Sequence, residues 1–199
     1  MFEQFSGNLI QCKNIFPPKV AEKIYLLFKK NKNWNKINQF KTKHYSHVFK
    51  SKSIFLPDSS EVYIAKFSKS EKLSGNKFIL ESLQNYIYPK IEKIFKFKIT
   101  VTDVRCHKFN NSDFLRTHFD DYASNYAVTI NLNKNWKWDW GGLLCVPYGK
   151  NFSRLHSLAP MWNTMNVLRS NNLKRSPHFV TSLQPFVKKP RYTITIFIK

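Results

Sequence analysis

The chain has 199 residues, of which 42% are hydrophobic and 16% aromatic, so it can form one packed core and is not disordered as a whole. It contains no apolar run near the roughly 20 residues of a membrane span, and its first residues lack the basic and apolar regions of a signal peptide. The formal charge of +21 would attract polyanions such as nucleic acids.

This positive charge has two explanations. Only six of the 33 basic residues are arginine, and lysine, asparagine, phenylalanine and isoleucine are all abundant. All four have codons rich in A and T, so an AT-rich genome would give this mixture without selection for nucleic-acid binding. The lysines are also spread along the chain. The charge alone therefore does not make nucleic-acid binding the leading hypothesis for the function.

The cysteines indicate a reducing environment. Cys12, Cys106 and Cys145 are odd in number and widely spaced. This pattern is typical of reduced thiols in a cytosolic protein, and not of a disulfide framework or a zinc knuckle. We therefore expect a cytoplasmic protein without a membrane segment.

The first half of the chain favours helices. Pro17 and Pro18 precede a stretch in which apolar residues recur at helical spacing, namely Val20, Ile24, Leu27 and Phe28. Residues 31–73 are mixed, with short strands expected near 46–56 and 61–67. A second helix is expected from a cap at Ser74 through Ile94, with Pro89 kinking or dividing it. Its apolar face would contain Leu80, Leu83, Ile87 and Ile91.

After Phe95 the pattern changes to short β-prone segments separated by turn residues. These segments are ITVTDVRCHKF, YAVTINLN, GGLLCVP, MNVLR, HFVTSL and RYTITIFIK. Helices followed by strands predict an α+β chain with a β-sandwich or barrel. We expect one domain over 1–199, with helical and mixed support over about 1–95 and the catalytic core over about 96–199.

A candidate metal site lies at the head of an apolar strand. Residues two apart in an extended segment point to the same side, so His118 and Asp120 can converge on one ion. His178, which begins a later apolar strand, is the best candidate for a third ligand. Two histidines and one carboxylate form the facial triad of non-haem iron oxygenases. Each of these residues alone is more often an ordinary hydrogen-bonded side chain.

A second feature makes the metal interpretation more specific. Arg191 opens RYTITIFIK, a strand that should run into the core. A guanidinium buried there needs an anionic partner. Thr193 faces the same side and offers a hydroxyl, so the pair suits a carboxylate.

The order of these pieces resembles the Fe(II)- and 2-oxoglutarate-dependent dioxygenases, and the prolyl-hydroxylase type in particular. The similarity covers roughly residues 85–199. It extends from FNNSDFLRTHFDD through INLNKNW, WGGLLCVP, LAPMWNTMNVLR and SPHFVTSL to RYTITIFI. It implies a double-stranded β-helix, or jelly-roll, core supported by N-terminal helices.

The resemblance also implies the site. It assigns Fe(II) to His118, Asp120 and His178, and the distal carboxylate of 2-oxoglutarate to Arg191 with Thr193. No catalytic residue beyond the metal centre is implied. The co-substrates would be 2-oxoglutarate and O2, with ascorbate as an optional reductant and with succinate and CO2 as co-products.

The sequence departs from the family pattern before the first ligands. A tyrosine that often reaches the co-substrate is replaced by Phe109, and Thr129 and Asn131 are candidates to take its part. Some relatives hold the distal carboxylate with lysine, where this chain has Arg191. Relatives that halogenate lack the carboxylate ligand, so the presence of Asp120 favours hydroxylation.

The remaining conspicuous residues have structural and functional interpretations. Gly141–Gly142 suggests a strand-start turn, or close backbone approach beside the metal. An aromatic stripe in NWKWDWGG favours packing over a substrate wall, with Trp136, Trp138 and Trp140 on one face of an extended segment. The other histidines show no partner spacing, namely His44, His47, His107 and His156. Asp121 is either support for a ligand or solvated.

Fold and triad leave the substrate open. The leading hypothesis is hydroxylation of a prolyl or other amino-acid substrate, free or in a peptide. The runner-up is a nucleic-acid oxidative demethylase, although that branch usually carries an arginine where this chain has Phe197. A third possibility is a jelly-roll protein that binds a metal without turnover. The oligomeric state stays open.

Overall fold

The computed structural model describes residues 2–5, 9–40, 63–118, 120, 124–169 and 176–199. The helices are α1 (Pro18–Lys30), α3 (Glu71–Ser74), α4 (Lys77–Ser82) and α5 (Tyr88–Phe95), and a π-helical segment, Leu83–Ile87, joins α4 to α5. The strands are β1 (Phe2–Phe5), β2 (Leu9–Lys13), β3 (Asn35–Phe40), β4 (Tyr63–Lys69), β5 (Val101–Phe109), β6 (Phe114–His118), β7 (Tyr126–Asn131), β8 (Leu144–Tyr148), β9 (Arg154–Leu158), β10 (Thr164–Arg169), β11 (His178–Val180) and β12 (Arg191–Ile198).

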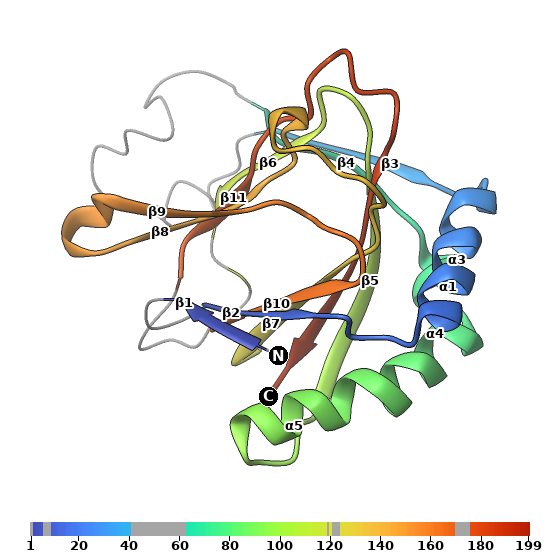
Figure 1. The fold of residues 1–199 in the computed structure, drawn as a ribbon. Helices are drawn as coiled ribbons and strands as arrows, with labels where there is room; N and C mark the ends of the chain where they lie inside the picture. The colour runs from blue at the N-terminus through green and yellow to red at the C-terminus, as the bar shows by residue number, and fades with distance from the viewer. Residues whose placement is uncertain (1, 6–8, 41–62, 119, 121–123, 170–175) are drawn as a thin grey trace.

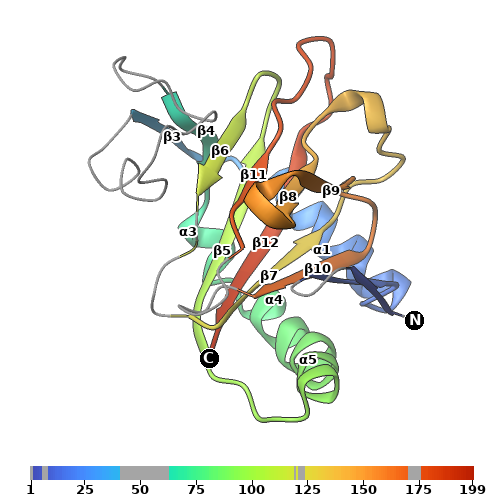
Figure 2. The ribbon, with the colours of Figure 1, turned by 90° about the vertical axis from the view of Figure 1, so that its left-hand side faces the viewer.

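The strands form one antiparallel sheet that curls on itself. Its order is β1-β2-β10-β7-β12-β5-β4-β6-β11-β8-β9, with β3 added on β4. Strand β4 joins two parts of this sheet, namely β1-β2-β10-β7-β12-β5 and β6-β11-β8-β9. It pairs with β5 through Ser68 and Lys69 and with β6 through Ala65 and Lys66. Figures 1 and 2 show the helices on the outer side of the β7-β12-β5 part. This is the double-stranded β-helix with supporting helices that the sequence predicts.

Strand β12 separates the helical core from the interior of the curl. Its sequence RYTITIFI alternates, and Ile194, Ile196 and Ile198 belong to the large core cluster together with the apolar faces of the helices. In α1 that face consists of Ala21, Ile24 and Phe28. Burying a large apolar side chain contributes roughly 1.5–3 kcal/mol, so this layer anchors the strand firmly. The alternate residues of β12 are therefore held facing the opposite, inner side.

The helical predictions are confirmed in outline and corrected in detail. The helix after Pro17 is α1. Ser74 does not cap a helix: it ends α3, whose cap is Ser70, and its hydroxyl accepts a hydrogen bond from the Cys106 backbone N–H. Asn76 caps α4 instead. Pro89 lies in the first turn of α5, directly after the π-helical segment, so the helix changes type next to the proline, which has no N–H to donate.

The buried face of the second helical region is also corrected. It contains Ile79, Leu83, Ile87 and Ile91, whereas Leu80 is only partly buried. Only the first position differs, so the buried residues recur every four positions from 79 to 91, and the π-helical segment Leu83–Ile87 lies in the middle of this face.

The strand predictions are confirmed for the second half of the chain, where β5, β7, β8, β10, β11 and β12 fall on the six expected segments. The strand expected near 61–67 is β4, and the one expected near 46–56 lies outside the described residues. The N-terminal half contributes more to the sheet than expected, because β2 pairs with β10 and β3 with β4.

Two further expectations concern the membrane and the thiols. In the described part of the chain, no helix has the length and apolar character needed to cross a membrane. All three cysteines are free and buried, as expected of reduced thiols.

Candidate active site

Two histidines meet across neighbouring strands at one end of the curl. His118 is the last residue of β6, and it pairs in register with His178, the first residue of β11. Their ring centroids are 4.2 Å apart. The pairing therefore brings together two residues that are sixty positions apart in the sequence.

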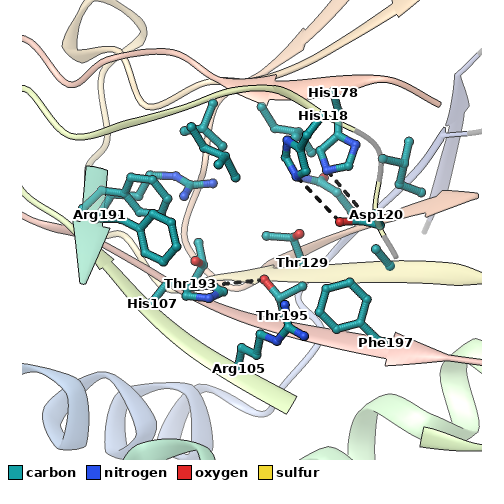
Figure 3. Close-up of a pocket in the computed structure, with 18 residues that line it drawn as sticks. Arg105, His107, His118, Asp120, Thr129, His178, Arg191, Thr193, Thr195 and Phe197 are labelled. Carbon is teal, nitrogen blue, oxygen red and sulfur yellow. Dashed lines mark hydrogen bonds and ion pairs between the residues drawn. The ribbon is translucent and has the colours of Figure 1, made fainter. Parts of the chain in front are cut away.

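Asp120 completes this group directly after β6. Its Oδ1 lies 3.7 Å from His118 Nε2, and its Oδ2 lies 3.5 Å from His178 Nε2. The ligand atoms of the three side chains all lie within 4.8 Å of one another. Figure 3 draws the two contacts between Asp120 and the histidines as dashed lines. The sequence-predicted triad is thus assembled in space.

The backbone fixes which ring nitrogen of each histidine faces the carboxylate. His118 Nδ1 lies 2.9 Å from the Arg116 carbonyl oxygen, and His178 Nδ1 lies 3.1 Å from the Ser176 carbonyl oxygen. Because a carbonyl only accepts, each Nδ1 carries the proton and donates it, which leaves Nε2 with its lone pair. This arrangement is typical of metal-binding histidines.

The resulting cluster fits a divalent cation. Two Nε2 lone pairs and a carboxylate face one another with no proton between them, and the buried Asp120 Oδ2 has no hydrogen-bond partner in the described part of the chain. Facing electron-pair donors repel unless a cation lies between them. Two imidazoles and one carboxylate suit a first-row metal such as iron.

The protonation states agree with metal binding. Burial alone would raise the pKa of Asp120, but His178 and His118 lower it to about 2. Burial lowers the pKa of His178 to about 4, against the opposing effect of Asp120. At neutral pH the carboxylate is therefore charged and His178 is neutral, and these are the states that coordinate a metal.

The cluster opens into a cavity of about 270 Å³ inside the curl. The wall includes side chains from both parts of the sheet and from β4. They are Phe67, Arg105, His107, Phe109, Leu115, His118, Asp120, Ala127, Thr129, Leu144, Asn166, Leu168, His178, Val180, Arg191, Thr193, Thr195 and Phe197.

Arg191 is a buried cation without an acidic partner among the described residues. It is 2% exposed, and its Nε has no hydrogen-bond partner there. Its guanidinium carbon lies 4.9 Å from the centre of the Phe109 ring. Burial lowers the pKa of Arg191 to about 9, so it stays charged at neutral pH. A buried unpaired charge is costly, so this guanidinium suits an anion from the cavity.

The surroundings of Arg191 hold it in place. Asn133, 3% exposed, accepts a hydrogen bond from the Tyr192 N–H at 2.6 Å and donates one to the Tyr192 carbonyl at 3.2 Å. A Cβ on Gly142, whose φ is +65°, would lie 2.8 Å from Leu183 Cδ1 and 3.0 Å from Arg191 Cδ. The close approach of Gly142 is thus to both of these side chains. That of Gly141 is to the Ser182 backbone, whose carbonyl oxygen would lie 2.1 Å from an added Cβ.

The polar wall between the histidine–aspartate cluster and Arg191 contains a histidine for which the sequence indicated no role. His107 lies on the cavity face of β5, where its Nδ1 is 3.4 Å from Thr195 Oγ1. Thr193 and Thr129 also line the cavity, whereas Asn131 donates to Thr164 Oγ1 and is not part of the wall. The missed signal was the i, i+2, i+4 spacing of Arg105, His107 and Phe109, which places all three on one strand face.

The pH dependence of stability should report the burial of His107. Burial, with help from Arg105 and Arg191, lowers the pKa of His107 to about 3, whereas an unfolded histidine titrates near 6.5. Between these two pKa values the unfolded chain binds a proton that the folded chain does not. The contribution of His107 to the free energy of unfolding is therefore complete above pH 6.5 and is lost as the pH falls.

Urea unfolding of the wild type and His107→Gln measures this effect. From pH 7.5 to 5.5 the wild type should lose about 1.4 kcal/mol more stability than the variant, because each unit of pKa difference corresponds to about 1.4 kcal/mol. Parallel curves for the two proteins would contradict a buried neutral His107.

The other residues singled out from the sequence lie elsewhere. The tryptophan stripe is not extended, because Trp138–Trp140 forms a 3₁₀ turn. Trp136 is buried and lies edge-on to Trp140 at 5.3 Å, whereas Trp138 is 58% exposed. None of the three lines the cavity, so the packing interpretation holds for Trp136. His156 stacks on Tyr148, and the predictions for His44, His47 and Asp121 lie outside the described residues.

The segment that carries the cluster, the cavity arginines and most of the sheet matches a known family. The model of the 2OG-Fe(II) oxygenase superfamily covers residues 104–199. This match covers the part of the chain that contains the site, and it supports a 2-oxoglutarate-dependent dioxygenase of this superfamily. The family uses Fe(II), 2-oxoglutarate and O2. No curated protein matches the chain by sequence.

Solved structures share the fold of this dioxygenase over nearly its whole length. A Trichoplax adhaerens prolyl hydroxylase in complex with a hypoxia inducible factor peptide fragment has a TM-score of 0.66 at 15% identity, covering 97% of this chain and 84% of that one. A Pseudomonas putida prolyl-4-hydroxylase has a TM-score of 0.63 at 14% identity, covering 98% and 93%. A 2OG-Fe(II) oxygenase family oxidoreductase from Burkholderia pseudomallei has a TM-score of 0.64 at 13% identity, covering 96% and 85%. At these identities the likeness establishes the fold.

Proposed function

We propose that this dioxygenase hydroxylates an unactivated C–H bond of a prolyl or other amino-acid substrate, free or in a peptide. In this proposal His118, Asp120 and His178 hold Fe(II), and Arg191 with Thr193 holds the distal carboxylate of 2-oxoglutarate. The observation that carries it is the pairing of two unsatisfied features in one cavity. One is a cluster of two imidazole lone pairs and a carboxylate that face one another, and the other is a buried guanidinium that no carboxylate of the described residues pairs with.

The cavity wall offers further groups for the co-substrate. Arg191 supplies a planar fork of N–H donors that matches a carboxylate, and the Thr193 hydroxyl, 1% exposed, faces the same space. His107 and Thr129 place additional hydrogen-bonding groups on the same wall. These groups take over the role of the tyrosine that Phe109 replaces, while the Phe109 ring supports the guanidinium from one side.

The apolar part of the wall keeps water away from the site. Leu115, Val180 and Leu144 come from β6, β11 and β8, and Phe67 comes from β4. A dry pocket strengthens the charge pairing of Arg191 and protects reactive species from side reactions. With iron bound, 2-oxoglutarate and O2 supply the oxidising power for C–H hydroxylation, with succinate and CO2 as co-products.

The amino-acid substrate is supported by the fold and by one neighbour. The Trichoplax adhaerens prolyl hydroxylase shares the fold and is described as a complex with a peptide fragment. We therefore propose a peptide or a free amino acid as the substrate class. Incubation with Fe(II), 2-oxoglutarate and a panel of prolyl peptides and amino acids tests this proposal. It predicts a product 16 Da heavier than its substrate, formed with succinate, and a panel that yields only unmodified members would contradict it.

The charge of +21 favours one other candidate, a nucleic-acid oxidative demethylase. Because lysine–phosphate contacts release counterions, affinity that comes from incidental charge falls steeply with salt. We expect a labelled oligonucleotide to bind weakly at low salt and to dissociate near physiological salt, without change to a methylated base. Anisotropy titrations at the two salt concentrations, with mass spectrometry of the bases, measure this. Tight binding at physiological salt or removal of the methyl group would reverse the ranking.

A further inference from the structure

The cavity contains a second arginine whose role the co-substrate does not explain. Arg105 lies on β5 and pairs in register with Thr195 of β12, whereas Phe109 pairs with Arg191. The two arginines are thus four residues apart along the strands, which corresponds to about 13 Å. Figure 3 shows them at separate places on the cavity wall, with Thr193 and Thr195 between them.

The surroundings of Arg105 differ from those of Arg191. The side chain of Arg105 is 51% exposed, so it lies where the cavity opens to solvent. Its Nε donates to Asp103 Oδ2 at 2.6 Å, and its guanidinium carbon lies 4.6 Å from the centre of the Phe197 ring. These two contacts restrain the guanidinium. The four N–H groups of its two Nη atoms have no acceptor among the described residues.

Arg105 also lies close to the proposed metal site. It lines the same cavity as His118, Asp120 and His178. With Fe(II) and 2-oxoglutarate bound, the charges of the metal, Asp120, the co-substrate and Arg191 cancel. The N–H donors of Arg105 that Asp103 does not use are then the remaining positive group on the cavity wall at its solvent-exposed side.

We infer that Arg105 binds a carboxylate of the primary substrate and so selects substrates that carry this carboxylate over their neutral amides. This inference rests on the proposed function. A planar guanidinium held by a ring and a neighbouring carboxylate presents its free edge as a bidentate partner for a carboxylate. The ligand group is either the α-carboxylate of a free amino acid or the side-chain carboxylate of a peptide.

Matched substrate pairs test the inference. The probes are L-proline against L-prolinamide and capped Pro-Asp against capped Pro-Asn, and the readout is succinate released above the substrate-free rate. In at least one of the two pairs, the acid should stimulate succinate release by the wild type and its amide should not. The proline pair reports the α-carboxylate of a free amino acid, and the capped pair reports a peptide side-chain carboxylate.

Variants of Arg105 assign the effect to this residue. Arg105→Gln should raise the KM of the stimulating acid about tenfold or more, and Arg105→Lys should recover part of the loss. The dissociation constant of 2-oxoglutarate should stay within about twofold, because Arg191 provides that contact. Arg154→Gln, at an exposed position of β9 outside the cavity wall, is the matched control and should leave the KM unchanged.

Three results would overturn the inference. They are equal stimulation by acids and amides, an unchanged KM in Arg105→Gln, and stimulation by a methylated oligonucleotide but by no acid. A wild type that neither binds 2-oxoglutarate nor forms succinate would instead refute the proposed function, and the inference would fall with it.

Discussion

Asp120→Ala is expected to abolish 2-oxoglutarate turnover and to lower Fe(II) affinity by at least about a hundredfold. Loss of a group that only orients a metal ligand already costs about 10- to 100-fold, so loss of a ligand should cost no less. The variant should still fold. Asp120 Oδ2 makes no hydrogen bond within the described residues, and removing a carboxylate that faces two imidazole lone pairs leaves no protein donor unpaired.

Metal titration and thermal unfolding of the metal-free protein separate these two effects. His178→Ala should behave like Asp120→Ala in the metal titration. Asp139→Ala is the matched control, because this exposed carboxylate lies in the turn Trp138–Trp140 outside the cavity wall. If either ligand variant keeps most of its Fe(II) affinity or its 2-oxoglutarate consumption, the assignment of the triad is wrong.

Arg191→Ala is expected to weaken 2-oxoglutarate binding by about 30-fold to several thousand-fold, the range found when one partner of a buried charged pair is truncated. Arg191→Lys should recover only part of the loss, because a point charge replaces a planar fork. Fe(II) affinity should survive both changes, since Arg191 is not one of the three clustered residues.

Arg191 should also lower the stability of the folded protein when no co-substrate is bound. Arg191 is 2% exposed, and no carboxylate of the described residues pairs with it. Replacing a buried, unpaired charge with an apolar side chain of similar length is often neutral or stabilising. We therefore expect Arg191→Met to unfold at the same or a higher temperature than the wild type while losing 2-oxoglutarate binding.

Calorimetric titration of 2-oxoglutarate into anaerobic Fe(II)-loaded protein measures the affinity, and thermal scans without ligand measure the stability. Arg154→Ala again serves as the control for loss of a positive charge. An unchanged dissociation constant in Arg191→Ala would return this arginine to a structural role.

The strands of the catalytic core could be predicted because each has an apolar face that must be buried. In RYTITIFI the isoleucines alternate with Arg191 and Thr193, so the period of two predicts both the strand and its inward polar face. The metal-ligand prediction from the spacing of His118 and Asp120 and from His178 at a strand start agrees with the structure. Strands β6 and β11 pair at the two histidines and so bring them together.

The sequence could not show which polar faces line a cavity. Arg105 and His107 alternate with Val104 and Cys106, a pattern that is typical of a strand with one face in solvent. Only the curl of the sheet turns that polar face inward, and this depends on the β4 pairings with β5 and β6. The short strands β6 and β9 were missed for a related reason, since FLRTH and RLHSL have little apolar periodicity of their own.

Oxygen labelling tests the central claim most directly. Wild-type protein is incubated with Fe(II), 2-oxoglutarate and ¹⁸O₂, and the succinate is analysed by mass spectrometry. A 2-oxoglutarate-dependent dioxygenase puts one atom of O2 into succinate, so we predict succinate that is 2 Da heavier than in ordinary air. Absence of succinate, or succinate without the label, would contradict the account.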